Sequence, residues 1–444
     1  MPPSVRPPDP RTPDPLATDP LAPDSRSTVR PLRRAATTAV LSVLALLAAC
    51  LGAFAAAAPA NAAGLTQVTS FGSNPGNLAM YEYAPANLPA GAPLVVALHG
   101  CTQSASDYFA NSGWQKYADL WGFALVFPQT SASNNALSCF SWFDSSKDTR
   151  GAGEAASVVS MVGHAQAQYG SDSSRVFVTG LSAGGGLTAD LLADYPDVFA
   201  GGSVDSGLPA QCATTQTASS QCQYASMNLT PAQWGDKVRA SDSGYSGREP
   251  RVAIWQGGGD YTVNPVNGTE LRDQWTNAWG ISQTASSTQS LPGGTTLSVY
   301  NDSAGAPAVE LYQIAGMAHG LAVDPGSGTD QCGATGTYYI DTICSSYYTA
   351  HFWGLDGSGS GSGSGGSTGG GTGGTGGTGG TGGGSGQCFT DSNYNQVAAG
   401  RAYQSGGYAY ADGSAQNLGL WNLLTVHTLK ETGNDYYVIA DSGC

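Results

Sequence analysis

Short apolar runs alternate along the middle of the chain with longer stretches in which apolar residues recur at helical spacing. The runs are rich in β-branched and aromatic residues and are too short for helices, which favours buried strands; they are 94–98, 123–127, 176–181, 201–204, 252–255 and 309–314. Helical spacing is found in 107–120, 154–168 and 185–195. Strands that alternate with helices predict an α/β fold, with a mostly parallel sheet and helices on both faces.

A second pattern divides the chain. Residues 357–386 are almost only Gly, Ser and Thr, which cannot bury apolar area, so we expect a flexible linker. It separates a large region, 63–356, from a small module, 387–444. In that module, alternating aromatics at 407–410 predict β structure. A hairpin is expected from the runs 423–431 and 436–440, with its turn at Gly433-Asn434.

The N-terminal 62 residues are interpreted as an extension and a signal peptide. Three arginines between positions 30 and 34 precede an apolar stretch, 35–58, and a small-x-small signature ends at Ala62, where we expect cleavage. The protein is then secreted and extracellular. Two alternatives are a membrane anchor, because the apolar run is long enough to span a bilayer, and lipidation at Cys50 in a lipoprotein-like box.

Charge and cysteine usage indicate which partners, crosslinks and cofactors the protein can have. The formal net charge is -15 and only 11% of residues are charged, which argues against nucleic acid or stable membrane association. Without Cys50, eight of the nine cysteines remain, an even number that indicates disulfides in an exported protein. Spacing favours the local pairs Cys101–Cys139, Cys212–Cys222, Cys332–Cys344 and Cys388–Cys444. No C-x-x-C or H-x-x-x-H spacing occurs, so neither a metal site nor a cofactor is expected.

The strongest chemical signal is the run Gly180-Leu181-Ser182-Ala183-Gly184. A G-x-S-x-G sequence indicates a nucleophile where a strand precedes it and a helix follows, as both do here. Ser182 would then lie at a helix N-terminus, where backbone amides and the helix dipole favour developing negative charge. We therefore expect an α/β-hydrolase with Ser182 as its nucleophile.

A nucleophilic serine needs a base, and the base needs an orienting acid. His319, between glycines just after the strand-like run 309–314, is the predicted base. Asp260 follows the run 252–255 and completes the order Ser, Asp, His of this fold; Asp205 is the alternative acid. The remaining histidines, at 99, 164, 351 and 427, are interpreted as core, surface or C-terminal-module residues.

Two backbone amides should bind the oxyanion. One is that of Ala183; the other should come from the loop after 94–98, where Gly100 lets the chain turn so that the amide of Cys101 points into the site. A Cys101–Cys139 bridge would hold this loop. The alternative is that His99-Gly100 is only a turn.

Five motifs in order, at 99–103, 150–154, 180–185, 260–265 and 316–320, resemble the poly(3-hydroxybutyrate) depolymerase-type esterase family, which includes feruloyl and acetylxylan esterases. The resemblance covers about 70–355 and implies a triad of Ser182, Asp260 and His319 with an oxyanion hole of Cys101 and Ala183. The C-terminal module is similar to the short substrate-binding domain of extracellular polyhydroxybutyrate depolymerases; a carbohydrate-directed module or a stabilising appendage are the alternatives.

The resemblance implies a serine esterase that hydrolyses an insoluble polyester, foremost poly(3-hydroxybutyrate), and we expect the protein to be a monomer. A feruloyl or acetylxylan esterase acting on a polysaccharide ester is one alternative, and a non-catalytic polymer-binding protein is another. Trp142 and Trp255 are candidates for the acyl pocket, unless they only pack in the core. Candidates for the polymer contact are aromatics of the module that could equally form its core: Tyr403, Tyr408, Tyr410 and Trp421.

Overall fold

The computed structural model describes residues 64–357, 388–398, 401–405, 408–420, 425–433 and 436–441. The predicted leader with Cys50, the linker after Gly357, Trp421 and Cys444 lie outside these residues. The described residues form a large domain, 64–357, and a C-terminal module, from 388 onward.

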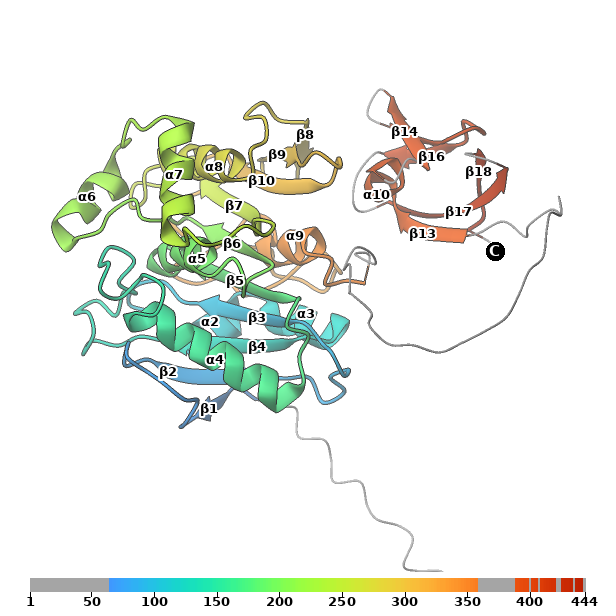
Figure 1. Ribbon diagram of the computed structural model, residues 1–444. Coiled ribbons are helices and arrows are strands. Elements are labelled where there is room, and N and C mark those ends of the chain that lie inside the picture. Colours follow the sequence, from blue (N-terminus) through green and yellow to red (C-terminus); the bar gives the residue numbers. More distant parts are fainter. Residues whose placement is uncertain are drawn as a thin grey trace, which may run out of the picture. The chain divides into compact units, whose positions relative to one another are not determined.

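A ten-stranded sheet forms the centre of the large domain, in the order β1-β2-β4-β3-β5-β6-β7-β10-β9-β8 (Figure 1). Its strands are β1 (Thr66–Val68), β2 (Ala79–Tyr83), β3 (Leu94–Leu98), β4 (Ala124–Gln129), β5 (Val176–Leu181), β6 (Gly201–Asp205), β7 (Arg251–Gly257), β8 (Ser287–Leu291), β9 (Thr295–Asn301) and β10 (Pro307–Ile314). The strands from β4 to β10 in this order run parallel, and antiparallel strands extend the sheet at both edges. The predicted strands are thus confirmed as the parallel centre.

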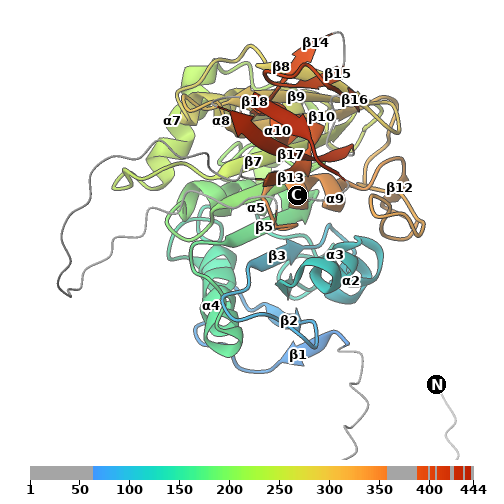
Figure 2. The same cartoon turned by 90° about the vertical axis from the view of Figure 1, so that its right-hand side faces the viewer.

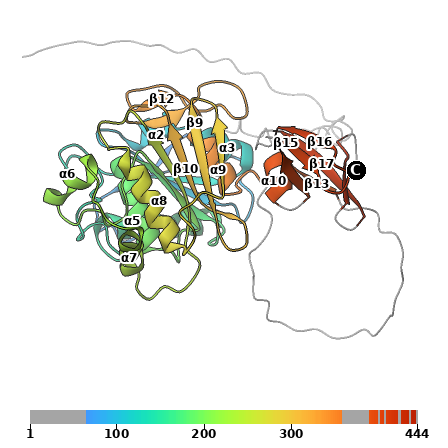
Figure 3. The same cartoon turned by 90° about the horizontal axis from the view of Figure 1, so that it is seen from above.

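Helices cover both faces of this sheet, as Figure 3 shows from above. Along β3, Leu94, Val96 and Leu98 pack with one cluster of buried residues, and Val95 and Ala97 pack with the other, because successive side chains of a strand point to opposite faces. The first face carries α4 (Gly153–Tyr169), α5 (Ala183–Asp194), α7 (Pro231–Ser241) and α8 (Val266–Ala278); the second carries α2 (Ala105–Asn111), α3 (Trp114–Trp121) and α9 (Ser345–Phe352).

The single helix predicted over 107–120 is wrong. The chain forms α2 and α3 instead, separated at Gly113, which has φ 84°. A Cβ at Gly113 would lie 2.6 Å from the side chain of Cys332, so the break brings the chain against the Cys332–Cys344 bridge. Hydrophobic spacing continued across the break and therefore concealed it.

Smaller elements surround the carboxyl ends of the central strands. They are α6 (Gln216–Tyr224), β11 (Leu321–Val323) and β12 (Tyr339–Asp341). The predicted bridges Cys101–Cys139, Cys212–Cys222 and Cys332–Cys344 are all present. Cys388 is also disulfide-bonded, while Cys444 lies outside the described residues. No helix in the described ranges is long and apolar enough to cross a membrane.

The C-terminal module is β-rich, as predicted (Figure 2). One sheet contains β13 (Cys388–Ser392), β17 (Val426–Gly433) and β18 (Tyr436–Ile439); the other contains β14 (Ala402–Ser405), β15 (Tyr408–Ala411) and β16 (Asn417–Leu420), with α10 (Asn393–Ala398) beside them. The expected hairpin is the antiparallel pair β17–β18. The core of the module is small and consists mainly of Ala402, Ala409, Ala411, Leu418, Leu429 and Tyr437.

Candidate active site

Ser182 occupies a sharp turn between β5 and α5. Its backbone has φ 58° and ψ -117°, a conformation that non-glycine residues rarely adopt and that is found mostly at functional sites. Two hydrogen bonds hold the turn: the Ser182 amide donates to the Asp205 carbonyl at 2.9 Å, and the Ser182 carbonyl accepts from the Gly186 amide at 2.9 Å. The serine is thus presented at the carboxyl edge of the sheet.

The glycines around Ser182 are required by close backbone contacts. A Cβ at Gly180 would lie 2.3 Å from the carbonyl oxygen of Gly184, and a Cβ at Gly184 would lie 2.6 Å from the carbonyl oxygens of Leu98 and His99. The start of α5 therefore packs directly against the end of β3. This contact brings Ser182 beside the loop that follows β3.

His319 and Asp260 meet at the ends of two adjacent parallel strands, β10 and β7. Nδ1 of His319 donates to Oδ2 of Asp260 at 2.8 Å, and Oδ1 of Asp260 accepts from the amides of Thr262 and Val263, both at 2.8 Å. The carboxylate is fully buried. A carboxylate bound in this way fixes the histidine tautomer and leaves Nε2 as the proton acceptor.

The alternative acid, Asp205, does not contact His319. Its carboxylate instead accepts hydrogen bonds from the hydroxyls of Thr179 and Ser203, at 2.9 and 3.3 Å. Burial raises the pKa of Asp205 to about 7. Asp205 supports the serine only through its backbone carbonyl, so the structure favours Asp260 as the partner of His319.

The loop after β3 is held from several directions. The Gly100 amide donates to Oε1 of Gln103 at 2.7 Å, the Thr102 amide donates to the Leu137 carbonyl at 2.7 Å, and Cys101 is bonded to Cys139. Thr102 in this loop also has a positive φ, 63°. These constraints keep Cys101 at the same cavity as Ser182 and Ala183.

His99 supports this loop as a neutral side chain. Its Nδ1 donates to the Gly100 carbonyl at 2.7 Å, and its Nε2 accepts from the Thr130 amide at 3.3 Å. Burial lowers the pKa of His99 to about 4. Two of the other histidines pair with carboxylates of their own: His351 pairs with Asp356, and His427 pairs with Asp441.

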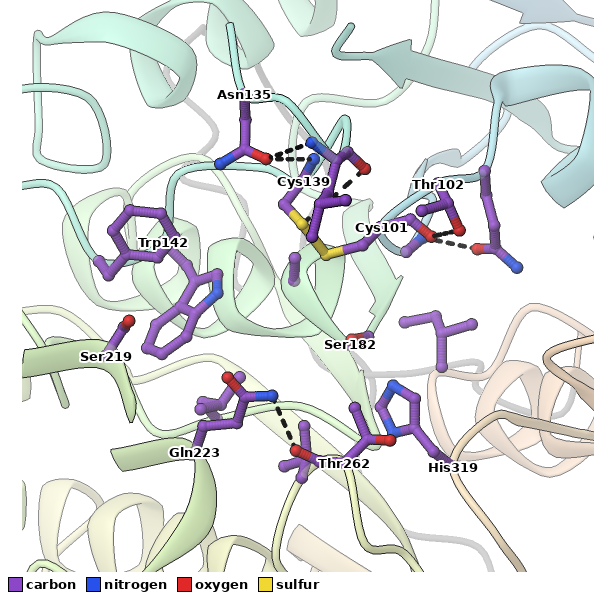
Figure 4. Close-up of a pocket in the computed structure, with 18 of the residues that line it drawn as sticks. Cys101, Thr102, Asn135, Cys139, Trp142, Ser182, Ser219, Gln223, Thr262 and His319 are labelled. Carbon is purple, nitrogen blue, oxygen red and sulfur yellow. Dashed lines mark hydrogen bonds between the residues drawn. A yellow bond between two sulfur atoms is a disulfide. The ribbon is translucent and has the colours of Figure 1, made fainter. Parts of the chain in front are cut away.

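A cavity of about 380 Å³ contains Ser182 and His319. In Figure 4, the Cys101–Cys139 bridge and Asn135 lie on one side of Ser182, and Gln223 and Thr262 lie on the other. A cavity of this size is in the range of small-ligand pockets. The described residues include no group of three or more His, Cys, Asp or Glu arranged to hold a metal ion.

The two tryptophans predicted for the acyl pocket have different positions. Trp142 lines the cavity and packs so closely on α5 that a Cβ at Gly186 would lie 2.7 Å from its ring. Trp255 is in the core: its ring stacks on Tyr312 with centroids 3.8 Å apart, and its Nε1 donates to the Thr349 hydroxyl. Trp255 is therefore a packing residue, and the alternative stated for it holds.

The motif at 150–154 supports Trp142 from behind. Oε2 of Glu154 accepts from the Ser141 amide at 2.6 Å, immediately before Trp142. Burial raises the pKa of Glu154 to about 7. Arg150 forms a bidentate pair with Asp197. The residues of this motif thus hold Trp142 in the cavity wall and do not contact Ser182.

Sequence reasoning missed one wall of the cavity, which comes from α6. Gln216, Ser219, Gln223 and Tyr224 all line it. The helix is mostly polar and carries no apolar periodicity, so the patterns that identified the other helices do not detect it. Its cysteine, Cys222, was the only signal, since the bridge to Cys212 restrains this segment.

In the C-terminal module, Tyr403 and Tyr408 are each 43% exposed and Tyr410 is half-buried against Tyr403, with ring centroids 5.5 Å apart. Trp421 lies outside the described residues. The small core of the module is formed by other residues, so Tyr403 and Tyr408 are available at its surface.

Comparison with known proteins agrees with this geometry. Residues 77–285 match the family described as "Esterase PHB depolymerase". The chain is 48% identical over 294 residues to poly(3-hydroxyalkanoate) depolymerase C of Paucimonas lemoignei, covering 66% of this chain and 70% of that protein. It is 34% identical over 282 residues to feruloyl esterase B of Talaromyces stipitatus, covering 62% and 77%.

A solved structure, acetyl xylan esterase from Aspergillus awamori, superposes with a TM-score of 0.56 at 28% identity and covers 66% of this chain and 99% of that one. The α/β-hydrolase fold predicted from the sequence is thereby confirmed. The relatives are ester hydrolases, so the non-catalytic alternative is set aside. The chain belongs to the Esterase PHB depolymerase family and is a carboxylic ester hydrolase.

Proposed function

We propose that this protein is an extracellular serine esterase that cleaves an insoluble polyester, poly(3-hydroxybutyrate) or a related poly(3-hydroxyalkanoate). The observation that carries the proposal is the 48% identity to a poly(3-hydroxyalkanoate) depolymerase. It is supported by Ser182, His319 and the amide-bearing loop at Cys101, which share one cavity. The three disulfides of the large domain are typical of proteins in oxidising compartments.

In the proposed mechanism, Nε2 of His319 takes the hydroxyl proton of Ser182 as Oγ attacks the ester carbonyl. The oxyanion accepts hydrogen bonds from the amides of Cys101 and Ala183. The tetrahedral intermediate then collapses with cleavage of the bond to the leaving alkoxide oxygen, which takes the proton from His319 and departs as the hydroxyl end of the cleaved chain, and a hydroxyacyl ester on Ser182 remains. Water, deprotonated by His319, releases the hydroxy acid and restores the serine. Asp260 holds the tautomer and stabilises the charged imidazole.

The C-terminal module supports a polymer substrate through its exposed sheet face. Along β14, β15 and β16, small apolar side chains point to the core, while Tyr403, Tyr408 and Leu420 are 43%, 43% and 54% exposed. Tyr408 pairs with Leu420, and Tyr403 with Tyr410, so these side chains share one outer face. A tethered module that adsorbs to the polymer raises the local concentration of the catalytic domain.

The second candidate is a feruloyl or acetylxylan esterase. It is favoured by the 34% identity to a feruloyl esterase and by the superposition on an acetyl xylan esterase. The same nucleophile, base and oxyanion loop would serve either ester, so the two candidates differ in substrate and not in mechanism.

A substrate panel tests the proposal. The secreted protein should clear a poly(3-hydroxybutyrate) suspension and release 3-hydroxybutyrate, with little release of ferulate or acetate from substituted xylans. Replacing Tyr403 and Tyr408 together with alanine should slow clearing of the suspension and leave hydrolysis of soluble p-nitrophenyl butyrate unchanged. Release of ferulate or acetate with a suspension that stays turbid would overturn the proposal in favour of the second candidate.

A further inference from the structure

The wall formed by α6 has a polar stripe that the proposed mechanism does not use. Gln216, Ser219 and Gln223, here called the α6 stripe, are spaced three and four residues apart and therefore share one face of the helix. All three line the cavity that contains Ser182, and Figure 4 shows Ser219 and Gln223 on the side of the cavity opposite the Cys101–Cys139 bridge. From Gln216 to Gln223 the helix rises about 10 Å, farther than a single ester extends.

The α6 stripe is fixed to the loop that carries the catalytic acid. Nε2 of Gln223 donates to the Thr262 carbonyl at 2.8 Å, and the Asn264 amide donates to the Gln223 carbonyl at 2.8 Å. Nδ2 of Asn267 donates to the Cys222 carbonyl at 3.2 Å. The Thr262 amide in turn binds Asp260. The wall is thus held in a constant position relative to the reacting centre, as a subsite requires.

The chemistry of the α6 stripe differs from the walls beside it. Leu137, Trp142, Leu208 and Val263 present apolar surface to the cavity, suited to the alkyl part of an acyl group. The hydroxyl of Ser219 donates to the backbone carbonyl of Gln216 at 2.8 Å, so its proton is not available to a ligand. Gln216 is exposed at the start of the helix, and its side chain ends in an amide with two N–H donors. The side-chain amide of Gln223 uses one N–H for the Thr262 carbonyl and has a second N–H that can donate to a ligand. The stripe therefore offers amide donors beside an apolar pocket.

A polyester matches this arrangement. Each of its units carries a carbonyl oxygen, an acceptor without a donor, and an alkyl group. We propose that the α6 stripe is a subsite for the ester carbonyl of the unit next to the scissile bond, with the amide of Gln216 as its main donor and Gln223 as the second. This rests on the proposed function and assigns the residues that favour consecutive esters over a single one.

The test compares two soluble substrates: a methyl ester of the 3-hydroxybutyrate trimer and p-nitrophenyl butyrate, which has no neighbouring unit. Gln216→Ala should lower kcat/KM for the trimer about 5-fold, the value of one neutral hydrogen bond, and leave p-nitrophenyl butyrate unchanged. Gln216→Glu, which keeps the length but removes the donor, should lose as much. Gln221→Ala is the matched control, because Gln221 is on the same helix, is exposed and does not line the cavity.

The loss for Gln216→Ala should be in KM, since the neighbouring unit is bound equally before and during the reaction. An equal loss on both substrates would show that α6 only supports the fold and would overturn the subsite. The subsite would also be overturned if Gln216→Ala left the ratio of kcat/KM for the trimer to kcat/KM for p-nitrophenyl butyrate unchanged. If the wild-type enzyme still clears the polymer in that case, the proposed function stands. A wild-type enzyme that hydrolyses neither trimer nor polymer would overturn both.

Discussion

Replacing Asp260 with asparagine tests the orientation of the base. Oδ1 of Asp260 already accepts two amide hydrogen bonds, from Thr262 and Val263, and Oδ2 accepts one from His319. An asparagine has one carbonyl oxygen. If that oxygen stays on the two amides, the NH₂ group faces Nδ1 of His319, which must then accept. The proton moves to Nε2, and the imidazole can no longer take the proton of Ser182.

The expected loss follows from this change of tautomer. In a serine protease with a Ser-His-Asp triad, the corresponding substitution lowers kcat about 10⁴-fold, which corresponds to about 5 kcal/mol in the barrier. The assay is kcat for p-nitrophenyl butyrate at constant pH, with the melting temperature measured to show that the variant is folded. Flipping the asparagine would restore the tautomer only by breaking both amide bonds, so a partial rescue is not expected.

Asp205→Asn is the matched control. Asp205 is equally buried, but its side chain binds only Thr179 and Ser203, and an asparagine oxygen can accept both bonds. Its kcat should stay within about 10-fold of the wild type, because no atom of the base or nucleophile loses a side-chain partner. If Asp260→Asn keeps more than a tenth of kcat, or Asp205→Asn causes the larger loss, the assignment of the acid is refuted.

Two further predictions concern the nucleophile turn and the dependence of stability on pH. Gly184→Ala places a Cβ 2.6 Å from two backbone oxygens and should lower kcat at least 10²-fold by displacing the oxyanion loop. Gly163→Ala is the control, because nothing lies within 4 Å of the added Cβ, and it should stabilise α4 by up to about 1 kcal/mol. Equal activities of the two variants would contradict the steric argument. Burial and neighbouring carboxylates raise the pKa of Asp194 to about 8 and, mainly through burial, that of Asp148 to about 6, well above the usual 3.8. The folded state then binds more protons than the unfolded state between about pH 4 and 8, so stability should fall over this range as pH rises, by on the order of a few kcal/mol. Denaturant unfolding at pH 5 and 8 checks the sign, and Asp194→Asn should reduce the difference; a wild type that is more stable at pH 8 would contradict it.

The parts of the fold that the sequence predicts are those with strong apolar periodicity. β3 and β5 begin and end at the predicted residues, because both are buried along their whole length and are short runs of mainly apolar residues. The antiparallel edge strands were not predicted. β8, with the sequence STQSL, is half-exposed and mostly polar, and its place in the sheet depends on pairing with β9 rather than on its own residues.

In the candidate site too, residues with a local sequence signal could be predicted, and residues placed by tertiary contacts could not. Ser182, Asp260 and His319 could be predicted because each lies in a glycine-rich turn directly after a strand, and parallel strands bring their carboxyl ends to one edge. For Trp255 the sequence left both the pocket and the core open, because an aromatic residue in a buried strand can face either side of the sheet; its side chain packs in the core. The α6 wall depends on contacts between residues about 40 positions apart, such as Gln223 with Thr262, and no local pattern reports these.

Every step of the proposed mechanism depends on Ser182 as the nucleophile of this esterase. The most direct measurement is labelling with a p-nitrophenyl alkylphosphonate, followed by mass spectrometry of the proteolysed enzyme. We expect one phosphonyl group, on the peptide that contains Ser182, with activity lost in proportion to labelling and no labelling of Ser182→Ala. Labelling at another residue, or ester hydrolysis that persists in Ser182→Ala, would contradict it.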